Sequence, residues 1–288
     1  MKLMIIFALV LTVGCASAPP ARTPGQHDNL MSVLWIQTAS EYAGNLRTLY
    51  AGAGDQLADL LERDGVTADL AQAAEYDCSI GVQCVALADQ NLIPAVVLDV
   101  DETALDNSSY QASLIANNMS FDPASWDEWL MARSATAVPG AVEFVLQAQA
   151  AGVAVIYLTN RRCQPRDGSE DSCPQKTDTI ANLAAAGFPE PKINDQIILR
   201  GERPDWDMSE KGTRRAWVAE RYRILMLIGD DMGDLASDVK RGSPKERTAF
   251  VEQHAEQFGE VWFQLPNPAY GSWVRALGAE NRQYLKLP

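Results

Sequence analysis

The sequence predicts an α/β protein in which a doubly wound parallel sheet carries a smaller helical cap. From about residue 139 onward, short apolar segments alternate with helical segments, which is typical of parallel strands joined by helices. The first apolar segment, residues 93–98, is rich in β-branched side chains, as expected of a strand buried on both faces. An aromatic-rich segment separates it from the next strand–helix unit, where an inserted cap would cover the end of the sheet.

The N-terminus has the layout of a secretory signal over residues 1–15. Lys2 precedes an apolar run, residues 3–14, that is too short to span a bilayer, and Cys15 follows it. The segment resembles a bacterial lipoprotein signal, which implies that Cys15 becomes the lipidated first residue of an exported protein. Secretion with a free Cys15 is the alternative. Residues 16–27, rich in Pro and small side chains, are expected to form a flexible tether.

Four cysteines follow the tether: Cys78, Cys84, Cys163 and Cys173. An even number in an exported protein predicts disulfide bonds, and the sequence alone permits three connectivities. The local pairing, Cys78 with Cys84 and Cys163 with Cys173, closes two short loops and is the preferred prediction. Buried free thiols are the alternative.

The composition describes an acidic globular protein with a formal net charge of −14. Such a surface repels nucleic-acid polymers and anionic lipid headgroups, so attachment to a membrane would depend on acyl chains at Cys15. About 270 residues follow the signal, enough for one large α/β domain with an added subdomain.

Residues 28–90 are expected to form a helical segment that packs on the core and on the cap. Apolar side chains recur at steps of three and four over residues 28–74. Second and third helices are expected over residues 56–61 and 67–75. Because no strand is expected in this segment, its predicted role is structural.

The α/β core is expected over residues 91–266, with a cap insertion at about 108–136 and a C-terminal tail at 267–288. The cap is expected to contain helices over residues 111–116 and 126–133. In the rest of the core the expected elements are helix 139–151, strand 153–158, helix 176–186, strand 193–199, helix 209–222, strand 224–228, helix 245–258 and strand 261–265.

Two aspartates, Asp99 and Asp101, follow the first strand at a spacing of two. Open α/β sheets bind ligands at the carboxyl ends of their strands, and residues two apart point the same way. Two close carboxylates repel each other unless a cation lies between them or one takes up a proton. With a divalent cation bound, one can act as nucleophile and the other as general acid and base. The alternative is an Asp-rich turn in which Thr103 caps a helix.

Polar residues also follow the second strand of the core. Thr159 and Asn160 would place a hydroxyl and an amide beside the two aspartates, and Thr159 is the candidate phosphate-binding hydroxyl. Lys211 opens a predicted helix, where a cation opposes the helix dipole unless an anionic ligand binds nearby. The alternatives are an ordinary turn at Thr159 and a solvated lysine at position 211.

A third group of polar residues follows the strand expected over 224–228. Asp230, Asp231 and Asp234 lie on one tight loop, which suits a hard cation. Asp230 is the predicted ligand, and Asp231 or Asp234 would orient waters or Lys211. Two acidic strand ends, a hydroxyl and a lysine together form a constellation suited to phosphoryl transfer.

These motifs resemble those of a known superfamily. DVDETALDN, LTN, the helix-opening Lys211 and GDDMGD, in this order, are similar to the four motifs of the haloacid dehalogenase (HAD) superfamily and its phosphohydrolase branch. The segments VLWIQTASEY, AVPGAVEF and LPNPAYGSW, with the signal ending in Cys15, resemble the class C lipoprotein acid phosphatases, a group of periplasm-facing, Mg²⁺-dependent 5'-nucleotidases. The resemblance extends from about residue 30 to 273 and implies a HAD-like Rossmannoid core.

The resemblance implies a role for each acidic motif residue. Asp99 would be the nucleophile that forms an aspartyl-phosphate, and Asp101 the general acid and base. Mg²⁺ would be held by Asp99, the backbone carbonyl of Asp101, and Asp230. Two further carboxylates would support the metal site: Asp231 and Asp234.

The resemblance also implies which residues meet the substrate. The phosphoryl group would be bound by Thr159, Asn160 and Lys211. Family members use aromatic side chains to grip a nucleoside, and the candidates here are Trp126, Trp129, Tyr270 and Trp273.

The sequence therefore predicts a Mg²⁺-dependent acid phosphatase that hydrolyses small phosphate esters, in particular nucleoside 5'-monophosphates. It would be anchored to the bacterial outer membrane and face the periplasm or the cell surface, and the resemblance implies a homodimer. Two alternatives are a lipoprotein that captures a nucleotide or another small ligand without turnover, and a phosphotransferase that acts on an acceptor alcohol.

Overall fold

The computed structural model describes residues 29–191, 196–279 and 281–286. The expected signal, Cys15 and the tether lie outside these residues. Within the described ranges, no helix is both long and apolar enough to cross a bilayer.

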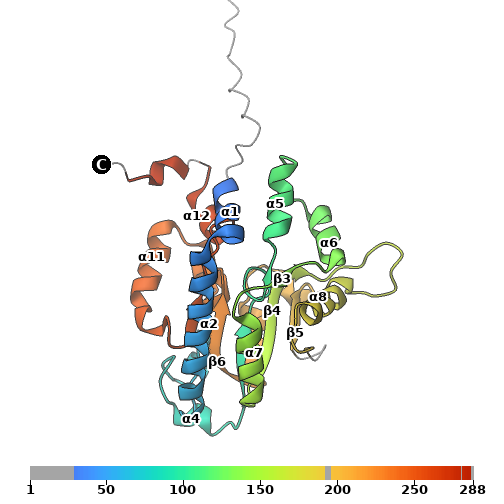
Figure 1. Ribbon diagram of the computed structural model, residues 1–288. Helices are drawn as coiled ribbons and strands as arrows, with labels where there is room; N and C mark the ends of the chain where they lie inside the picture. The colour runs from blue at the N-terminus through green and yellow to red at the C-terminus, as the bar shows by residue number, and fades with distance from the viewer. Residues whose placement is uncertain (1–28, 192–195, 280, 287–288) are drawn as a thin grey trace, which may run out of the picture.

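Five parallel strands form the central sheet, in the order β5–β4–β1–β6–β7 (Figure 1). The strands are β1 (Ile93–Leu98), β4 (Ala154–Arg162), β5 (Ile197–Arg200), β6 (Tyr222–Gly229) and β7 (Trp262–Gln264). Strand β1 lies at the centre, where Leu98 pairs with Tyr157 of β4 on one side and with Ile228 of β6 on the other. The predicted parallel α/β fold is confirmed.

A helix precedes each later strand of the central sheet. These helices are α7 (Ala141–Ala150), α8 (Pro174–Ala185), α9 (Gly212–Ala219) and α11 (Pro244–Gln253). Helix α9 is shorter than the predicted 209–222 because Tyr222 already pairs with Ile93 in the sheet. Strand β4 continues past the predicted end at Leu158 to Arg162. Part of the strand expected over 193–199 lies outside the described residues, and β5 begins at Ile197.

The N-terminal segment contains α1 (Leu30–Thr38), α2 (Ser40–Leu61), α3 (Leu70–Glu75) and the short α4 (Val85–Ala88). The separate helix predicted over 56–61 was wrong, because residues 40–61 form one continuous helix. Gly54, inside α2, leaves no room for a side chain: a Cβ there would collide with Gln147 of α7, whose amide donates to the Gly54 carbonyl at 3.1 Å. Figure 1 shows α2 and α7 side by side in front of the sheet.

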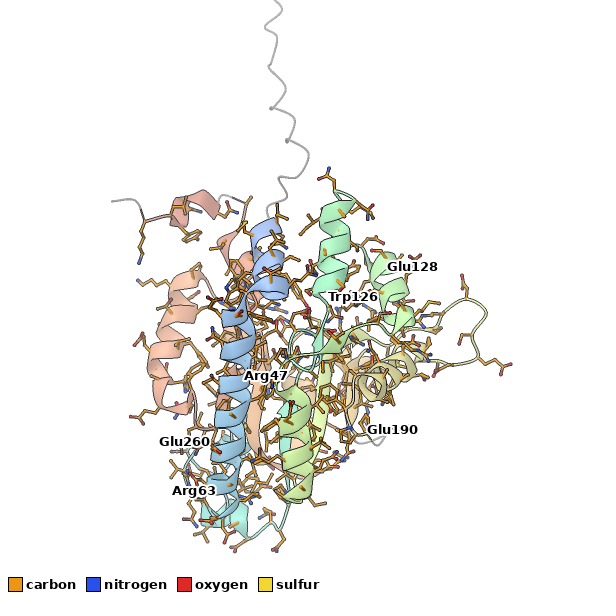
Figure 2. The ribbon with its side chains drawn as sticks, in the orientation of Figure 1. Arg47, Arg63, Trp126, Glu128, Glu190 and Glu260 are labelled. Atoms are coloured by element: carbon orange, nitrogen blue, oxygen red, sulfur yellow. A yellow bond between two sulfur atoms is a disulfide. The ribbon has the colours of Figure 1, made fainter. Side chains whose placement is uncertain are left out.

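Contacts at the opposite end from the cap tie the N-terminal segment to the core. Arg63 forms an ion pair with Glu260 at 2.7 Å, and Figure 2 shows both residues far from Trp126 of the cap. The indole of Trp262, on β7, donates to the carbonyl of Ala68 at 2.8 Å. The segment is therefore an integral layer of the α/β domain.

The cap lies between two short antiparallel strands, β2 (Leu105–Asp106) and β3 (Thr136–Ala137). It consists of α5 (Ser108–Ala116) and α6 (Pro123–Ala132), which Figure 1 shows above the sheet. Pro123 occupies the first turn of α6, and Asp122 accepts hydrogen bonds from the next two free N–H groups. The β2–β3 pair thus closes the base of the cap.

The remaining elements are short; η3 precedes β7, and the others follow the carboxyl ends of β5, β6 and β7. They are η1 (Pro204–Trp206), α10 (Met232–Leu235), η2 (Asp238–Arg241), η3 (Ala255–Gln257), α12 (Ser272–Leu277) and η4 (Asn281–Tyr284).

Two disulfides are present, Cys78–Cys84 and Cys163–Cys173. The predicted local pairing is confirmed. The first closes a loop before α4, and the second closes the loop between β4 and α8, beside the cap.

Candidate active site

The sheet topology brings two acidic strand ends together. Asp99 follows β1 and Asp230 follows β6, and these two strands are neighbours. The backbone N–H of Asp99 continues the pairing, because it donates to the carbonyl of Ile228 at 3.0 Å. Both carboxylates therefore lie at the carboxyl edge of the sheet, where open α/β folds bind ligands.

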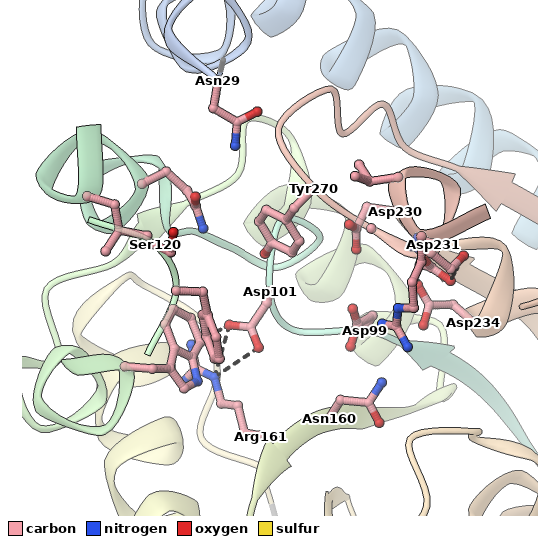
Figure 3. Close-up of a pocket in the computed structure, with 18 of the residues that line it drawn as sticks. Asn29, Asp99, Asp101, Ser120, Asn160, Arg161, Asp230, Asp231, Asp234 and Tyr270 are labelled. Carbon is pink, nitrogen blue, oxygen red and sulfur yellow. Dashed lines mark hydrogen bonds and ion pairs between the residues drawn. The ribbon is translucent and has the colours of Figure 1, made fainter. Parts of the chain in front are cut away.

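Three carboxylates and one lysine form the centre of this site. Oxygen atoms of Asp99, Asp230 and Asp234 lie within 4.8 Å of one another. Lys211 Nζ donates to Asp99 Oδ1 at 2.5 Å and to Asp234 Oδ1 at 2.7 Å. Figure 3 shows the three aspartates grouped on one side of a cavity. The predicted proximity of Asp99, Lys211 and Asp230 is thus present in the structure.

The electrostatics of this acidic cluster favour a cation. Burial raises the pKa of Asp99 to about 7, although the neighbouring Lys211 lowers it. Burial also holds the pKa of Asp230 well above its usual range, with Asp234 and Asp99 adding to the effect. Three carboxylates share one ammonium, so when ionised they leave two negative charges unbalanced. Hard oxygen ligands with this residual charge fit a divalent cation.

Close packing around β6 and hydrogen bonds from two other loops hold the acidic cluster in place. A Cβ at Gly229 would collide with the Asp234 side chain, so the glycine lets this carboxylate approach the strand. Thr103 Oγ1 donates to Asp230 Oδ1 at 3.2 Å, and Asn267 Nδ2 donates to Asp230 Oδ2 at 2.8 Å. Sequence analysis did not find Asn267. The available signal was its place among the first polar residues after β7, the strand beside β6.

Asp231 differs from Asp234 in its hydrogen-bond partners and does not join the acidic cluster. Its Oδ1 accepts from the N–H of Gly233 at 2.8 Å and from Ser272 Oγ at 2.8 Å, and its Oδ2 accepts from the N–H of Ser272 at 2.5 Å. Burial alone would raise the pKa of Asp231, but these hydrogen bonds lower it below the usual value. Asp231 therefore caps α10 and ties it to α12, whereas Asp234 joins the acidic cluster.

Asp101 is turned away from the acidic cluster and toward Arg161 (Figure 3). Arg161 Nη2 donates to Asp101 Oδ1 at 2.7 Å, and the arginine side chain is 1% exposed. Asn107 Nδ2 donates to the same oxygen at 3.0 Å. Sequence analysis assigned no role to Arg161 or to Asn107, because their contacts with Asp101 depend on the tertiary structure.

Thr159 and Asn160 lie at the end of β4, and their side chains face different neighbours. Thr159 is fully buried, and its Oγ1 lies 3.4 Å from Asp101 Oδ2 and accepts from the backbone N–H of Arg161. Asn160 lines the cavity, and its Oδ1 accepts from Arg214 Nη2 at 2.7 Å. The buried Arg214, which sequence analysis missed, also donates to the Thr159 carbonyl at 2.5 Å. Arg214 therefore holds the carboxyl end of β4 in place.

A cavity of about 650 Å³ lies above the acidic cluster, between the cap and the C-terminal elements. Trp126 and Tyr270, two of the aromatic candidates, line it. Trp129 does not, because its indole N–H is directed at Asn107. Trp273 is also absent from the lining, and its indole donates to two backbone carbonyls. The cavity thus has a charged base and partly aromatic walls.

A parallel sheet with two acidic strand ends, a buried lysine beside them and a helical cap above defines the HAD class of phosphoryl-transfer proteins. A comparison with protein families narrows the assignment. Residues 61–273 match the family model described as HAD superfamily, subfamily IIIB (acid phosphatase). The chain belongs to this family.

Known proteins show the same relationship. The chain is similar to the class C acid phosphatase from Bacillus anthracis, with 29% identity, a TM-score of 0.67, and coverage of 90% of this chain and 91% of that one. The tungstate-bound structure of a class C acid phosphatase from the same organism matches with 29% identity, a TM-score of 0.69, and coverage of 90% and 97%. A curated relative, acid phosphatase 1 from Solanum lycopersicum, is 28% identical over 177 residues, which span 60% of this chain and 57% of the relative.

Proposed function

We propose that the protein is a Mg²⁺-dependent acid phosphatase that hydrolyses small phosphate monoesters through an aspartyl-phosphate on Asp99. The observation that carries this proposal is the acidic cluster with Lys211, which lies at the base of the cavity. A capture protein would gain nothing from three buried carboxylates, because they repel the phosphate of a ligand unless a cation is bound.

The donor set suits Mg²⁺. Asp99 and Asp230 would hold the ion, with Asp234 beside them and the backbone carbonyl of Asp101 as a further ligand from the family resemblance. When bound, the cation would neutralise part of the phosphate charge and so let the ester approach a carboxylate nucleophile.

The residues of this chain divide the remaining chemistry. Lys211 holds Asp99 in place and supplies positive charge where the phosphoryl oxygens would lie. Asp99 forms a bond to phosphorus while the bond from phosphorus to the ester oxygen breaks, and Asp101 protonates the departing alcohol. Asp101 then accepts a proton from the water that attacks the aspartyl-phosphate and frees Asp99.

The shape of the cavity supports a nucleoside 5'-monophosphate as substrate. Its volume of about 650 Å³ exceeds the needs of inorganic phosphate, and its aromatic walls offer Trp126 and Tyr270 as surfaces for a base. The related class C enzyme from Bacillus anthracis is described with bound tungstate, an oxyanion that resembles phosphate in shape. A small phosphorylated ligand is therefore the occupant that fits both ends of the cavity.

The test is phosphate release from a panel of nucleoside monophosphates and aryl phosphates near pH 5, with and without Mg²⁺, for the wild type and for Asp99→Asn. We expect Mg²⁺-dependent release that the substitution abolishes. Bound nucleotide with no release from any ester would favour the capture protein. Phosphorylated glycerol in place of free phosphate, when glycerol is added, would favour the phosphotransferase.

The cellular location is a separate proposal that rests on the sequence. We propose that Cys15 carries a lipid that anchors the protein to the outer membrane, with the tether joining it to the α/β domain. Expression of Cys15→Ser should move the protein from the membrane fraction to the soluble exported fraction. Retention of the variant in the membrane would contradict the anchor.

A further inference from the structure

The side chain of Asn107 connects Asp101 of the core to the cap. Asn107 is fully buried, and its Nδ2 donates to Asp101 Oδ1 at 3.0 Å. Its Oδ1 accepts from Trp129 Nε1 at 2.8 Å, and Trp129 lies on cap helix α6. One amide therefore bridges the two parts of the molecule.

The partners of Asn107 determine which way its amide faces. An indole N–H can only donate, whereas an ionised carboxylate can only accept, so the amide oxygen faces Trp129 and the nitrogen faces Asp101. The backbone N–H of Asn107 donates to Glu102 Oε1 at 2.9 Å, which holds the residue from a third direction. A half-turn of the amide would place its oxygen against the carboxylate and lose the bonds to Asp101 and Trp129.

The two oxygens of Asp101 have unequal surroundings. Oδ1 accepts from Arg161 Nη2 at 2.7 Å, from Arg161 Nε at 3.0 Å and from Asn107 at 3.0 Å. Oδ2 has only longer contacts, at 3.3 Å to Arg161 Nε and 3.4 Å to Thr159 Oγ1. Asp101 also lines the cavity. Because Oδ1 is surrounded by donors, Oδ2 is the oxygen left to carry a proton.

We propose that Asn107 is a positioning residue that keeps Oδ2 of Asp101 available to the leaving group, and that α6 controls it through Trp129. The inference rests on the proposed function and deepens it. During cleavage, Asp99 bonds to phosphorus, the phosphorus–ester oxygen bond breaks, and the proton on Oδ2 moves to that oxygen. Attack by water then returns a proton to Oδ2 and releases phosphate from Asp99.

A comparison of esters with different leaving groups can distinguish a positioning role of Asn107 from a purely structural one. p-Nitrophenolate departs as a stable anion and needs little help from an acid, whereas an alkoxide such as that of benzyl alcohol must be protonated as it leaves. The value of kcat/KM reports the steps up to the first bond cleavage. A misplaced Asp101 should therefore slow benzyl phosphate far more than p-nitrophenyl phosphate.

The experiment measures kcat/KM for both esters, with Mg²⁺, on four variants. Asn107→Ala removes the side-chain bonds to Asp101 and Trp129, together with a bond to the Leu105 carbonyl. Trp129→Phe removes only the indole N–H and keeps an aromatic ring. Asp101→Asn measures the full effect of losing the acid. Trp217→Phe is the matched control, because Trp217 lies on α9 and its indole nitrogen has no hydrogen-bond partner among the described residues.

We expect Asn107→Ala and Trp129→Phe to lower kcat/KM for benzyl phosphate by about tenfold or more, part of the roughly 10²–10⁴-fold that general acid catalysis supplies. The value for p-nitrophenyl phosphate should fall much less, and Trp217→Phe should change neither. Equal losses on both esters, or no loss, would overturn the inference. If Asn107→Ala does not fold, Trp129→Phe decides the question.

The proposed function and the inference fail in different ways. If Asp99→Asn were as active as the wild type, the aspartyl-phosphate mechanism itself would be refuted. An active wild type in which Asp101→Asn slows both esters equally would leave the phosphatase intact and overturn the role of Asn107.

Discussion

At the scale of single residues, Lys211 is the counter-charge of the site. It is 2% exposed and contacts both Asp99 and Asp234. Burial alone would lower the pKa of Lys211, but the two carboxylates raise it above its usual value, so the ammonium stays charged. The residue therefore stabilises the buried carboxylates when no cation is bound.

Replacing this ammonium should unbalance the site. Without divalent cations at pH 8, Lys211→Met should destabilise the fold by about 3–5 kcal/mol, because two buried carboxylates lose their partner. Added Mg²⁺ should recover part of the lost melting temperature. Lys176→Met, which breaks a more exposed pair with Glu202, is the control and should cost less. Equal melting temperatures for Lys211→Met and the wild type would contradict this role.

Gly229 shapes the acidic cluster through the side chain that it lacks. In Gly229→Ala the new methyl group would displace Asp234, and we expect the Mg²⁺ concentration for half-maximal activity to rise by about 10–100-fold. Gly44→Ala, where nothing lies within 4 Å of the added carbon, is the matched control. A Mg²⁺ dependence that is unchanged in Gly229→Ala would show that Asp234 is not required for binding the metal.

The residues that could be predicted from the sequence share one property: each stands next to a recognisable strand or helix end. Asp99, Asp230 and Lys211 follow from that rule together with the parallel topology. Asn267 and Arg161 could not be assigned roles, because their roles depend on which strands are neighbours and on which way a side chain turns. The difference between Asp231 and Asp234 likewise depends on the position of α12.

At the scale of elements, the loop closed by Cys163–Cys173 joins the cap to the core. Arg166, inside this loop, donates to Asp127 of α6 at 2.6 and 2.8 Å and to Asp178 of α8 at 2.5 Å. The disulfide joins the two ends of the loop that carries Arg166. We call the contacts of Arg166 with Asp127 and Asp178 the Arg166 clamp. Sequence analysis predicted the disulfide but not the clamp, because residues 163–173 have no periodic pattern from which contacts could be inferred.

The clamp should persist at acidic pH. The hydrogen bonds from Arg166 hold the pKa of Asp127 below the ordinary aspartate value of 3.8. A lowered carboxylate pKa stabilises the fold above the unfolded value, and this contribution is lost only as pH falls through the folded one. The melting temperature of Asp127→Asn should therefore stay below that of the wild type by a constant amount from pH 7 to about pH 5, with the gap closing below about pH 4.

Thermal unfolding of the two proteins across this range is the measurement. Asp171→Asn is a control for carboxylate loss within the same loop, since the contacts of the Asp171 side chain are with Cys173 and Thr177. A gap that closed already between pH 7 and pH 5 would mean that the clamp is not held by an ionised Asp127.

At the scale of the whole molecule, the N-terminal helices belong to the active domain although the family match begins at residue 61. The hydroxyl of Tyr50, on α2, donates to the Thr103 carbonyl at 2.7 Å, and Thr103 in turn contacts Asp230. The sequence predicted a structural layer here. It could not reveal that this layer contacts the loop that supports the acidic cluster.

Loss of that hydroxyl should be measurable. Tyr50→Phe should lower the free energy of unfolding by about 1 kcal/mol and weaken the response to Mg²⁺, because the Thr103 carbonyl loses a buried partner. Tyr157→Phe is a close control, since the buried Tyr157 hydroxyl has no hydrogen-bond partner among the described residues. Denaturant unfolding of both variants decides the matter, and equal effects would contradict the role of Tyr50.

The cavity wall draws on both ends of the described chain, because Asn29 lines it from the N-terminal side and Val274 and Arg275 from the C-terminal side. All three residues of the acidic cluster are synthesised by residue 234, some forty positions before the wall is complete. A nascent or prematurely terminated chain would thus carry the reactive aspartates without the enclosure that binds an ester. Completion of synthesis is therefore a condition for a finished binding site.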